Sequence, residues 1–222
     1  MKKYFAGMLL WMISCRVYAA EVVAVEPPAP QEAPSLIAPE DVLRPVIEVC
    51  AACHGVDGAA KDNATIPILA AQYPRYLQQQ LQHFSQGDKG PRPNPLMEPI
   101  AAALSEVEKT AISQYYGGLP KQWLETPQRE DLQKGRRIYL GGVFDKKIAA
   151  CSSCHSPTGF GNEPANYPSL SGQHAEYLIT QLQDYRAKTR IHPIMNTIAA
   201  KLSDEEIEAV AYYLQGLRSK TF

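Results

Sequence analysis

One five-residue pattern occurs twice in this chain, as CAACH from Cys50 to His54 and as CSSCH from Cys151 to His155. The two copies lie 101 residues apart in a chain of 222 residues, and they hold four of its five cysteines. In each copy the two thiols are about one helical turn apart, and a histidine directly follows the second cysteine. Each copy therefore offers two thiols and an imidazole to a single bound group.

This spacing is typical of covalent haem attachment. Both thiols can add to the two vinyl groups along one haem edge, and the histidine then lies under the iron as a nitrogen ligand. A thioredoxin-like pair would need a βαβ context, which the sequence lacks. A structural zinc site with four ligands per metal and a disulfide scaffold remain as alternatives. We predict two covalently bound haem c groups, with thioether bonds from Cys50, Cys53, Cys151 and Cys154 and with iron ligands His54 and His155.

The repetition extends beyond the two motifs. ILAAQYPRYLQQQLQHF aligns with SLSGQHAEYLITQLQDY at the offset of 101, and LMEPIAAALSEVEKTAISQYYGGL aligns with IMNTIAAKLSDEEIEAVAYYLQGL at an offset of 98. Such self-similarity indicates two homologous domains. Each half predicts a helix toward its motif, an irregular loop, a middle helix, a proline-containing loop and a final helix. The final helices begin with capping boxes, Ser105 with Glu108 and Ser203 with Glu206, and the predicted fold class is all-α.

The second axial position of each iron needs another donor. If the first 19 residues are removed, only two methionines remain, and each lies shortly before the sequence IAA of its own repeat. Met97 follows His54 by 43 residues, and Met195 follows His155 by 40. A lone methionine usually fills space in a core, but one per repeat at matching positions favours axial ligation. The other histidines do not recur at matching positions: they are His83, His174 and His192.

The N-terminus is typical of an export signal. Two lysines precede an apolar stretch that is too short to span a bilayer, and VYA supplies a cleavage pattern. A retained anchor, a buried N-terminal helix and lipidation at Cys15 remain as alternatives. The next segment is rich in proline and alanine and predicts an extended tether. We expect a signal peptide at 1–19, a Pro-rich linker at 20–39, a first domain at 40–120, an interdomain linker at 121–127 and a second domain at 128–222.

The charge balance carries no signature of nucleic-acid binding. The chain holds 22 basic and 23 acidic residues, for a net charge of −1. Loss of the first 19 residues makes this −4, because they include three basic residues and no acidic one. A mildly acidic chain lacks the basic surface that nucleic acids require.

The sequence resembles the bacterial dihaem cytochromes c of the cytochrome c4 family, above all in CSSCHSPTGFGNEPANYPSLSGQHAEYLITQL and IAAKLSDEEIEAVAYYLQGL. The resemblance covers residues 40–222 and implies two class I cytochrome c domains related by pseudo-twofold symmetry, with the haems near their interface. It implies that the backbone carbonyls of Pro67 and Pro168 accept hydrogen bonds from the rings of His54 and His155. It also implies haem-pocket positions for Leu69, Leu170, Tyr115 and Tyr213.

Two haems with both axial positions filled favour a redox carrier, because no coordination position stays open for a substrate. The resemblance adds a quinol-oxidising complex as the electron donor and a terminal oxidase as the acceptor. We therefore expect a periplasmic electron-transfer protein of the respiratory chain, with membrane association left open. A dihaem enzyme of the peroxidase or thiosulfate dehydrogenase type and a tethered haem subunit of a larger oxidoreductase complex remain as alternatives.

Overall fold

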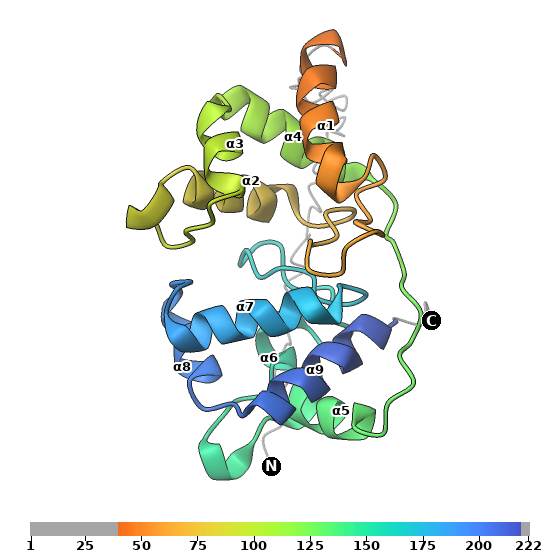
Figure 1. The fold of residues 1–222 in the computed structure, drawn as a ribbon. Coiled ribbons are helices and arrows are strands. Elements are labelled where there is room, and N and C mark those ends of the chain that lie inside the picture. The colour runs from red at the N-terminus through yellow and green to blue at the C-terminus, as the bar shows by residue number, and fades with distance from the viewer. Residues whose placement is uncertain (1–39, 219–222) are drawn as a thin grey trace, which may run out of the picture. The chain divides into compact units, whose positions relative to one another are not determined.

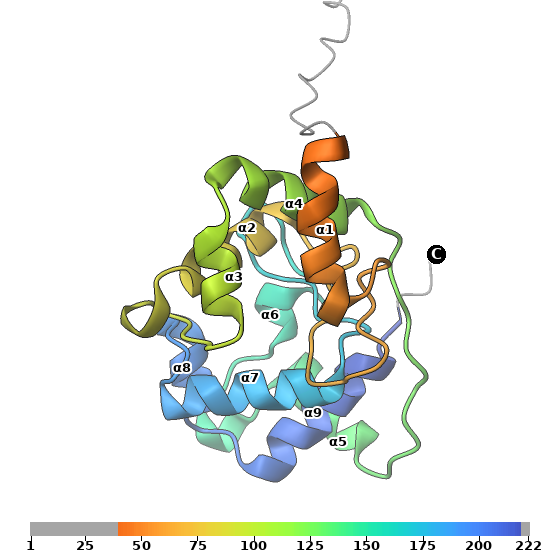
Figure 2. The same ribbon diagram turned by 45° about the horizontal axis from the view of Figure 1, so that its top comes forward.

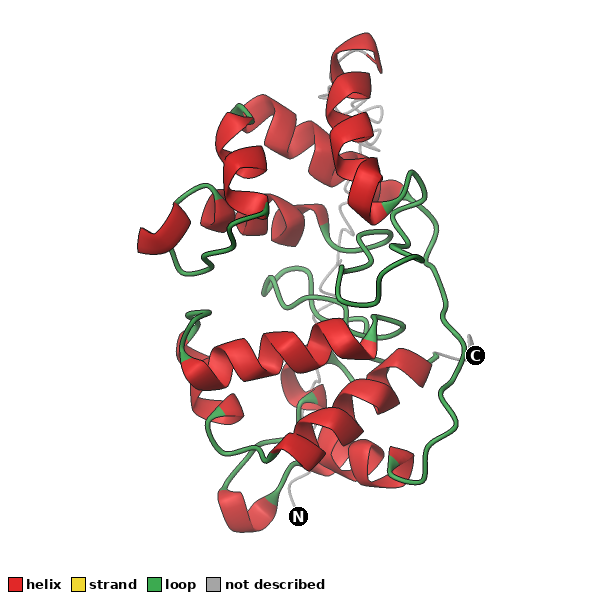
Figure 3. Ribbon diagram, viewed as in Figure 1, coloured by secondary structure: helices red, strands yellow, loops and turns green. Residues whose placement is uncertain are grey.

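The computed structural model describes residues 40–218, and this part of the chain consists of helices and loops (Figure 3). Both repeats belong to one compact unit. Within the described residues, β-structure is limited to two isolated bridges, one in each of two loops of the second repeat. The predicted all-α fold class is confirmed. The expected signal peptide at 1–19 and linker at 20–39 lie outside the described residues.

The first half begins with a helix that runs straight through its cysteine motif and ends on the histidine. The predicted capping box is present in its final helix, where the Ser105 hydroxyl accepts from the Glu108 N–H at 3.3 Å and the Glu108 carboxylate accepts from the Ser105 N–H at 2.8 Å. The helices of this half are α1 (Glu40–His54), α2 (Pro74–Phe84), the short 3-10 helix η1 (Gly87–Lys89), α3 (Met97–Ala103) and α4 (Glu106–Gly118).

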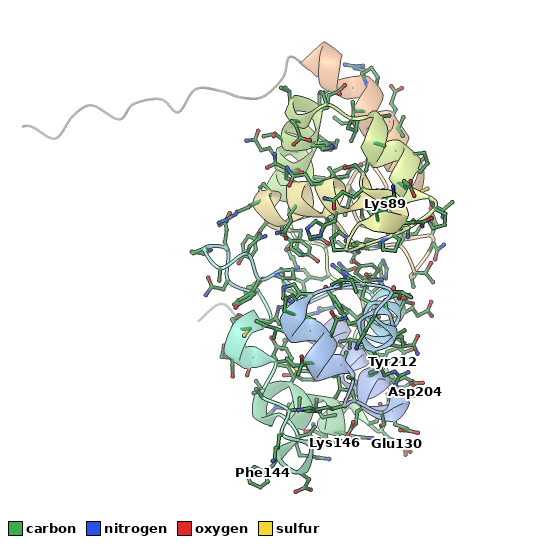
Figure 4. All side chains as sticks on the ribbon, turned by 90° about the vertical axis from the view of Figure 1, so that its left-hand side faces the viewer. Lys89, Glu130, Phe144, Lys146, Asp204 and Tyr212 are labelled. Carbon is green, nitrogen blue, oxygen red and sulfur yellow. The ribbon has the colours of Figure 1, made fainter. Side chains whose placement is uncertain are left out.

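The second half separates its leading helix from its motif. The leading helix ends before Gly142, whose φ of +73° allows the chain to turn back, and an added Cβ there would lie 2.9 Å from the Ala149 carbonyl carbon. The intervening loop carries Phe144, which is 94% exposed and stands clear of the ribbon (Figure 4). The helices are α5 (Leu132–Gly141), η2 (Phe144–Lys146), α6 (Ser152–His155), α7 (Ala175–Ala187), α8 (Pro193–Ala199) and α9 (Asp204–Gly216).

The segments that carry the two methionines differ from the prediction. The sequence predicted a proline-containing loop in each half, whereas the structure forms the short helices α3 and α8 there. A proline occupies the first turn of α8, where its missing N–H costs no helical hydrogen bond. Backbone N–H groups at the start of both helices are bound by side chains of Asn94 and His192.

Each half has its own apolar core. In the first half, α4 packs against α1 and α2, and its buried residues Ile112 and Tyr116 lie in that core. In the second half, α9 packs against α5 and α7 (Figure 1). Ile207, Val210 and Leu214 recur at helical spacing on the buried face of α9 and are each at most 3% exposed.

The loops that follow the two cysteine motifs meet between the halves. Figure 2 shows the orange loop after α1 passing close to the cyan loop before α7. The contact is polar and buried: the side chain of Gln72 binds the backbone of Ser169, and the side chain of Gln173 binds the backbone of Ile68.

Over the part of the chain that the structure covers, no helix combines the length and the apolar character that a membrane crossing requires.

A glycine-to-alanine pair on α5 tests the packing of the second core. A Cβ at Gly135 would clash with the Ala209 carbonyl and lie 2.8 Å from the Tyr213 Cβ, whereas a Cβ at Gly141 meets no atom within 4 Å. We expect Gly135→Ala to lower the free energy of unfolding of the holoprotein by about 1–3 kcal/mol, because α5 and α9 must move apart. Gly141→Ala should be neutral or stabilise by up to about 1 kcal/mol. Equal effects of the two changes in denaturant unfolding would contradict the close approach of these helices.

Candidate haem sites

The two motif histidines are bound to backbone carbonyls in the same way. The Nδ1 atom of His54 lies 3.0 Å from the Pro67 oxygen, and Nδ1 of His155 lies 3.1 Å from the Pro168 oxygen. A carbonyl oxygen only accepts hydrogen bonds, so each Nδ1 carries the proton and each Nε2 keeps its lone pair. Neither Nε2 forms a hydrogen bond to any described residue. This is the arrangement in which an imidazole binds a metal through Nε2.

Burial keeps both rings neutral. His54 is 7% exposed and His155 is 9% exposed. Loss of solvent lowers the pKa of both histidines, and the hydrogen bonds to Pro67 and Pro168 partly offset this effect. A neutral imidazole is the form that ligates iron, because protonation would remove the lone pair.

Two motif thiols lie near the end of α1, and the other two belong to Cys151, which directly precedes α6, and to Cys154 within it. None of the four forms a disulfide, and burial raises the pKa of Cys50 and of Cys151 to about 11. Among residues 40–218, no three histidine, cysteine, aspartate or glutamate side chains gather as a metal site. Each motif therefore presents a pair of unbonded sulfur atoms and one imidazole.

The space beside the first motif fits a large apolar ring. A cavity of about 240 Å³ lies next to Cys50. Its walls come from α1, from the end of α3 and from Leu104, which directly follows α3. They are apolar throughout, with Pro45, Val46, Val49, Ile100, Ala103 and Leu104 as the remaining lining residues. An apolar cavity lined by one motif thiol, Cys50, suits the apolar ring of a haem.

The expected pocket residues border these sites. Leu69 and Tyr115 are partly buried against the first core, and Leu170 and Tyr213 are partly buried against the second. The Tyr115 hydroxyl donates to the Val56 carbonyl at 3.2 Å. All four residues thus lie on the motif-bearing cores, as the resemblance implied, and their contacts with haem stay predictions.

The two methionines lie at related but different points of their helices. Met97 is the first residue of α3, and its N–H donates to the Asn94 side chain at 2.9 Å. Met195 is the third residue of α8, and its N–H donates to Nδ1 of His192 at 3.3 Å. His192 therefore caps the helix that carries Met195. Ligation of iron by the two methionine sulfur atoms remains a prediction.

Sequence reasoning missed two buried tyrosines that hold the motif ends. The Tyr139 hydroxyl donates to the Ser156 carbonyl at 2.5 Å and lies 3.2 Å from the His155 carbonyl. The Tyr116 hydroxyl donates to the Gly55 carbonyl at 3.3 Å. Both rings are at most 1% exposed. The sequence predicted that both tyrosines lie in helices. Its pattern does not indicate that their hydroxyl groups bind backbone carbonyls on the other side of the core.

Comparison with known proteins identifies the family. The family model described as cytochrome c matches residues 132–218. A cytochrome c4 from Azotobacter vinelandii is 38% identical over 180 residues, which span 76% of this chain and 84% of the relative. The chain belongs to the cytochrome c4 family. It is accordingly a dihaem electron-transfer protein with two covalently bound haem c groups, one for each Cys-x-x-Cys-His motif.

The similarity extends to three dimensions. The crystal structure of reduced recombinant cytochrome c4 from Pseudomonas stutzeri matches with a TM-score of 0.76 and 34% identity, over 82% of this chain and 100% of that one. The tandem arrangement of two cytochrome c domains is thereby confirmed. A protein named thiosulfate dehydrogenase electron acceptor, from Stutzerimonas stutzeri (strain A1501), is 36% identical over 181 residues, which span 79% of this cytochrome and 82% of that relative.

Removal of one tyrosine hydroxyl tests the support of the second motif. Tyr139→Phe leaves the buried end of α6 without a donor, and we expect it to lower the free energy of unfolding by about 1–3 kcal/mol. Tyr115→Phe is the matched control, because its partner Val56 is 69% exposed and water can replace the lost hydrogen bond. We expect it to change the free energy of unfolding by less than about 0.5 kcal/mol. Denaturant unfolding of the two holoproteins measures the difference. Equal stability of the two variants would contradict a supporting role for Tyr139.

Proposed function

We propose that this cytochrome carries electrons in the periplasm from a quinol-oxidising complex to a terminal oxidase, and that it does not itself convert a small-molecule substrate. One observation carries the proposal. In each half a buried histidine is held through Nδ1, which leaves the lone pair of Nε2 unprotonated, and a methionine recurs at an equivalent point of the repeat. Export through the segment at 1–19 accounts for the location, and the Pro-rich segment at 20–39 suits a protein that stays near a membrane surface.

The ligands proposed for iron are His54 with Met97 in the first half and His155 with Met195 in the second. When bound, haem supplies an iron whose oxidation state changes by one electron. With one histidine and one methionine holding each iron, no coordination position would remain for a substrate, so the residues of this chain favour electron transfer over catalysis. The carbonyls of Pro67 and Pro168 fix the ring orientations and make the imidazoles more basic.

The apolar walls set the electrostatic environment. Val46 and Leu104 are among the apolar residues that line the cavity beside Cys50. A dry apolar pocket disfavours the additional positive charge of oxidised iron, which raises the reduction potential. A potential raised in this way suits a protein that accepts electrons from a quinol-oxidising complex.

Two buried arginines supply positive charge where the halves meet. Arg92 donates to Gln80 at 2.8 Å and to Gln181 at 3.0 Å, and Arg190 donates to Gln181 at 2.6 Å and to Gln80 at 2.9 Å. Both arginines are less than 10% exposed, and neither joins an ion pair within residues 40–218. Buried cations need a compensating charge, and the carboxylates of the haem propionates are the anions that this protein would bind there.

A second electron donor is supported by one relative. The name thiosulfate dehydrogenase electron acceptor belongs to a protein that is 36% identical over most of both chains. An acceptor of electrons from such an enzyme would use the same proposed histidine and methionine ligands. The second candidate is therefore the same carrier with a thiosulfate dehydrogenase as its donor.

Anaerobic kinetics with the oxidised holoprotein distinguish these functions. We expect membranes that contain a quinol-oxidising complex to reduce both haems, and membranes that contain a terminal oxidase to reoxidise them. Reduction only in the presence of purified thiosulfate dehydrogenase and thiosulfate would favour the second donor. Turnover of thiosulfate or of hydrogen peroxide by the holoprotein alone would identify a dihaem enzyme and contradict the carrier function.

A further inference from the structure

Two equivalent glutamines reach across the boundary between the halves. Gln72 precedes α2, and Gln173 occupies the same position of the repeat before α7. Each side chain is 7% exposed. Each side-chain oxygen also accepts from the N–H of the next residue, Tyr73 or His174, at 3.1 Å. These local bonds fix the orientation of the two amides.

Each glutamine makes two hydrogen bonds to one residue of the other half. The Gln173 oxygen accepts from the Ile68 N–H at 2.8 Å, and its NH₂ group donates to the Ile68 carbonyl at 2.9 Å. The Gln72 oxygen accepts from the Ser169 N–H at 2.9 Å, and its NH₂ group donates to the Ser169 carbonyl at 2.9 Å. The four bonds are buried, so water does not compete for them.

The peptide groups bound in this way are the ones that hold the motif histidines. The Ile68 N–H and the Pro67 carbonyl belong to the same peptide group, and that carbonyl accepts from His54 Nδ1 at 3.0 Å. The same holds for Ser169, Pro168 and His155, with a ring-to-carbonyl distance of 3.1 Å. A continuous chain of hydrogen bonds therefore runs from each histidine through one peptide group to a glutamine of the opposite half.

We propose that Gln173 and Gln72 are positioning residues that tune the reduction potential of the haem in the opposite half, Gln173 through His54 and Gln72 through His155. The inference deepens the proposed function and rests on the ligand roles proposed for these histidines.

The direction of the effect follows from polarisation. A hydrogen bond accepted from the N–H end of a peptide group makes its carbonyl oxygen more negative. The more negative oxygen binds the histidine N–H more strongly, which makes Nε2 a better donor to iron. A stronger donor favours oxidised iron, so each glutamine lowers the potential of the haem across the boundary.

Single substitutions with apolar residues test this crossed assignment. We expect Gln173→Leu to raise the potential of the haem bound at Cys50 and Cys53, and Gln72→Leu to raise that of the haem bound at Cys151 and Cys154. The expected size is roughly a threefold change in the oxidation equilibrium, or about 28 mV at 59 mV per tenfold for one electron. Redox titration followed by NMR measures each haem separately, with each set of haem signals assigned through contacts to its own cysteine motif.

Two further variants separate this effect from general loosening of the boundary. Gln79→Leu is the matched control, because Gln79 binds Asn166 of the other half at 3.0 Å and does not contact the peptide groups that hold the histidines. It should leave both potentials unchanged. Gln173→Glu keeps an oxygen that accepts from the Ile68 N–H, whether the carboxyl group is ionised or neutral. It should therefore not raise the potential of the haem bound at Cys50 and Cys53.

The outcomes are distinct. Unchanged potentials in both leucine variants, equal shifts of both haems, a shift confined to the haem of the substituted half, or a rise in Gln173→Glu would each overturn the inference. The crossed shift in a protein that fails to exchange electrons with quinol-oxidising membranes would support the inference and contradict only the proposed function. Normal electron exchange with quinol-oxidising membranes but no crossed shift would support the proposed function and contradict only the inference.

Discussion

The hydrogen bond between each motif histidine and a backbone carbonyl 13 residues later is the contact on which both sites depend. It assigns the proton to Nδ1, keeps the lone pair of Nε2 unprotonated and fixes the plane of the ring. The bond requires the loop after the motif to fold back onto the histidine. In both halves a glycine carbonyl anchors this return, with Leu69 N–H bound to Gly58 at 2.8 Å and Leu170 N–H bound to Gly159 at 2.7 Å.

Glycine is needed at positions 58 and 159 because the returning chain passes close to the backbone there and leaves no room for a side chain. Gly58 and Gly159 have φ of +65° and +75°. A Cβ at Gly58 would lie 3.0 Å from the Ala70 nitrogen of the returning chain and 2.9 Å from the Tyr116 ring, and a Cβ at Gly159 would lie 3.1 Å from the Ser171 nitrogen. The same tyrosine donates to the carbonyl that follows the first motif. Motif, loop and final helix therefore form one connected unit in the first half. The second half repeats the loop but takes its supporting tyrosine from α5, so the duplicated sites share their geometry at the histidine and differ in their support.

The sequence predicted the parts of the fold that depend on local chemistry. Both capping boxes form as the Ser-x-x-Glu pattern indicates, and the period of apolar residues placed the buried face of α9 correctly. The carbonyl partners of His54 and His155 followed from the resemblance to cytochrome c4. The break between α5 and α6 could not be predicted, because it depends on how Gly142 approaches the backbone near Ala149. Gln72 and Gln173 were visible as a repeated pair, but a repeat does not say that each side chain binds the opposite half.

Ligation of each iron by one histidine and one methionine is the central claim, and the proton NMR spectrum of the fully reduced holoprotein tests it most directly. The ring current of a haem shifts the methyl group of an iron-bound methionine far upfield. We expect two such methyl signals, one assigned to Met97 and one to Met195. A single signal, or none, would contradict this ligation. It would also contradict the argument that the protein transfers electrons without acting as an enzyme, because that argument requires both axial positions of each iron to be filled.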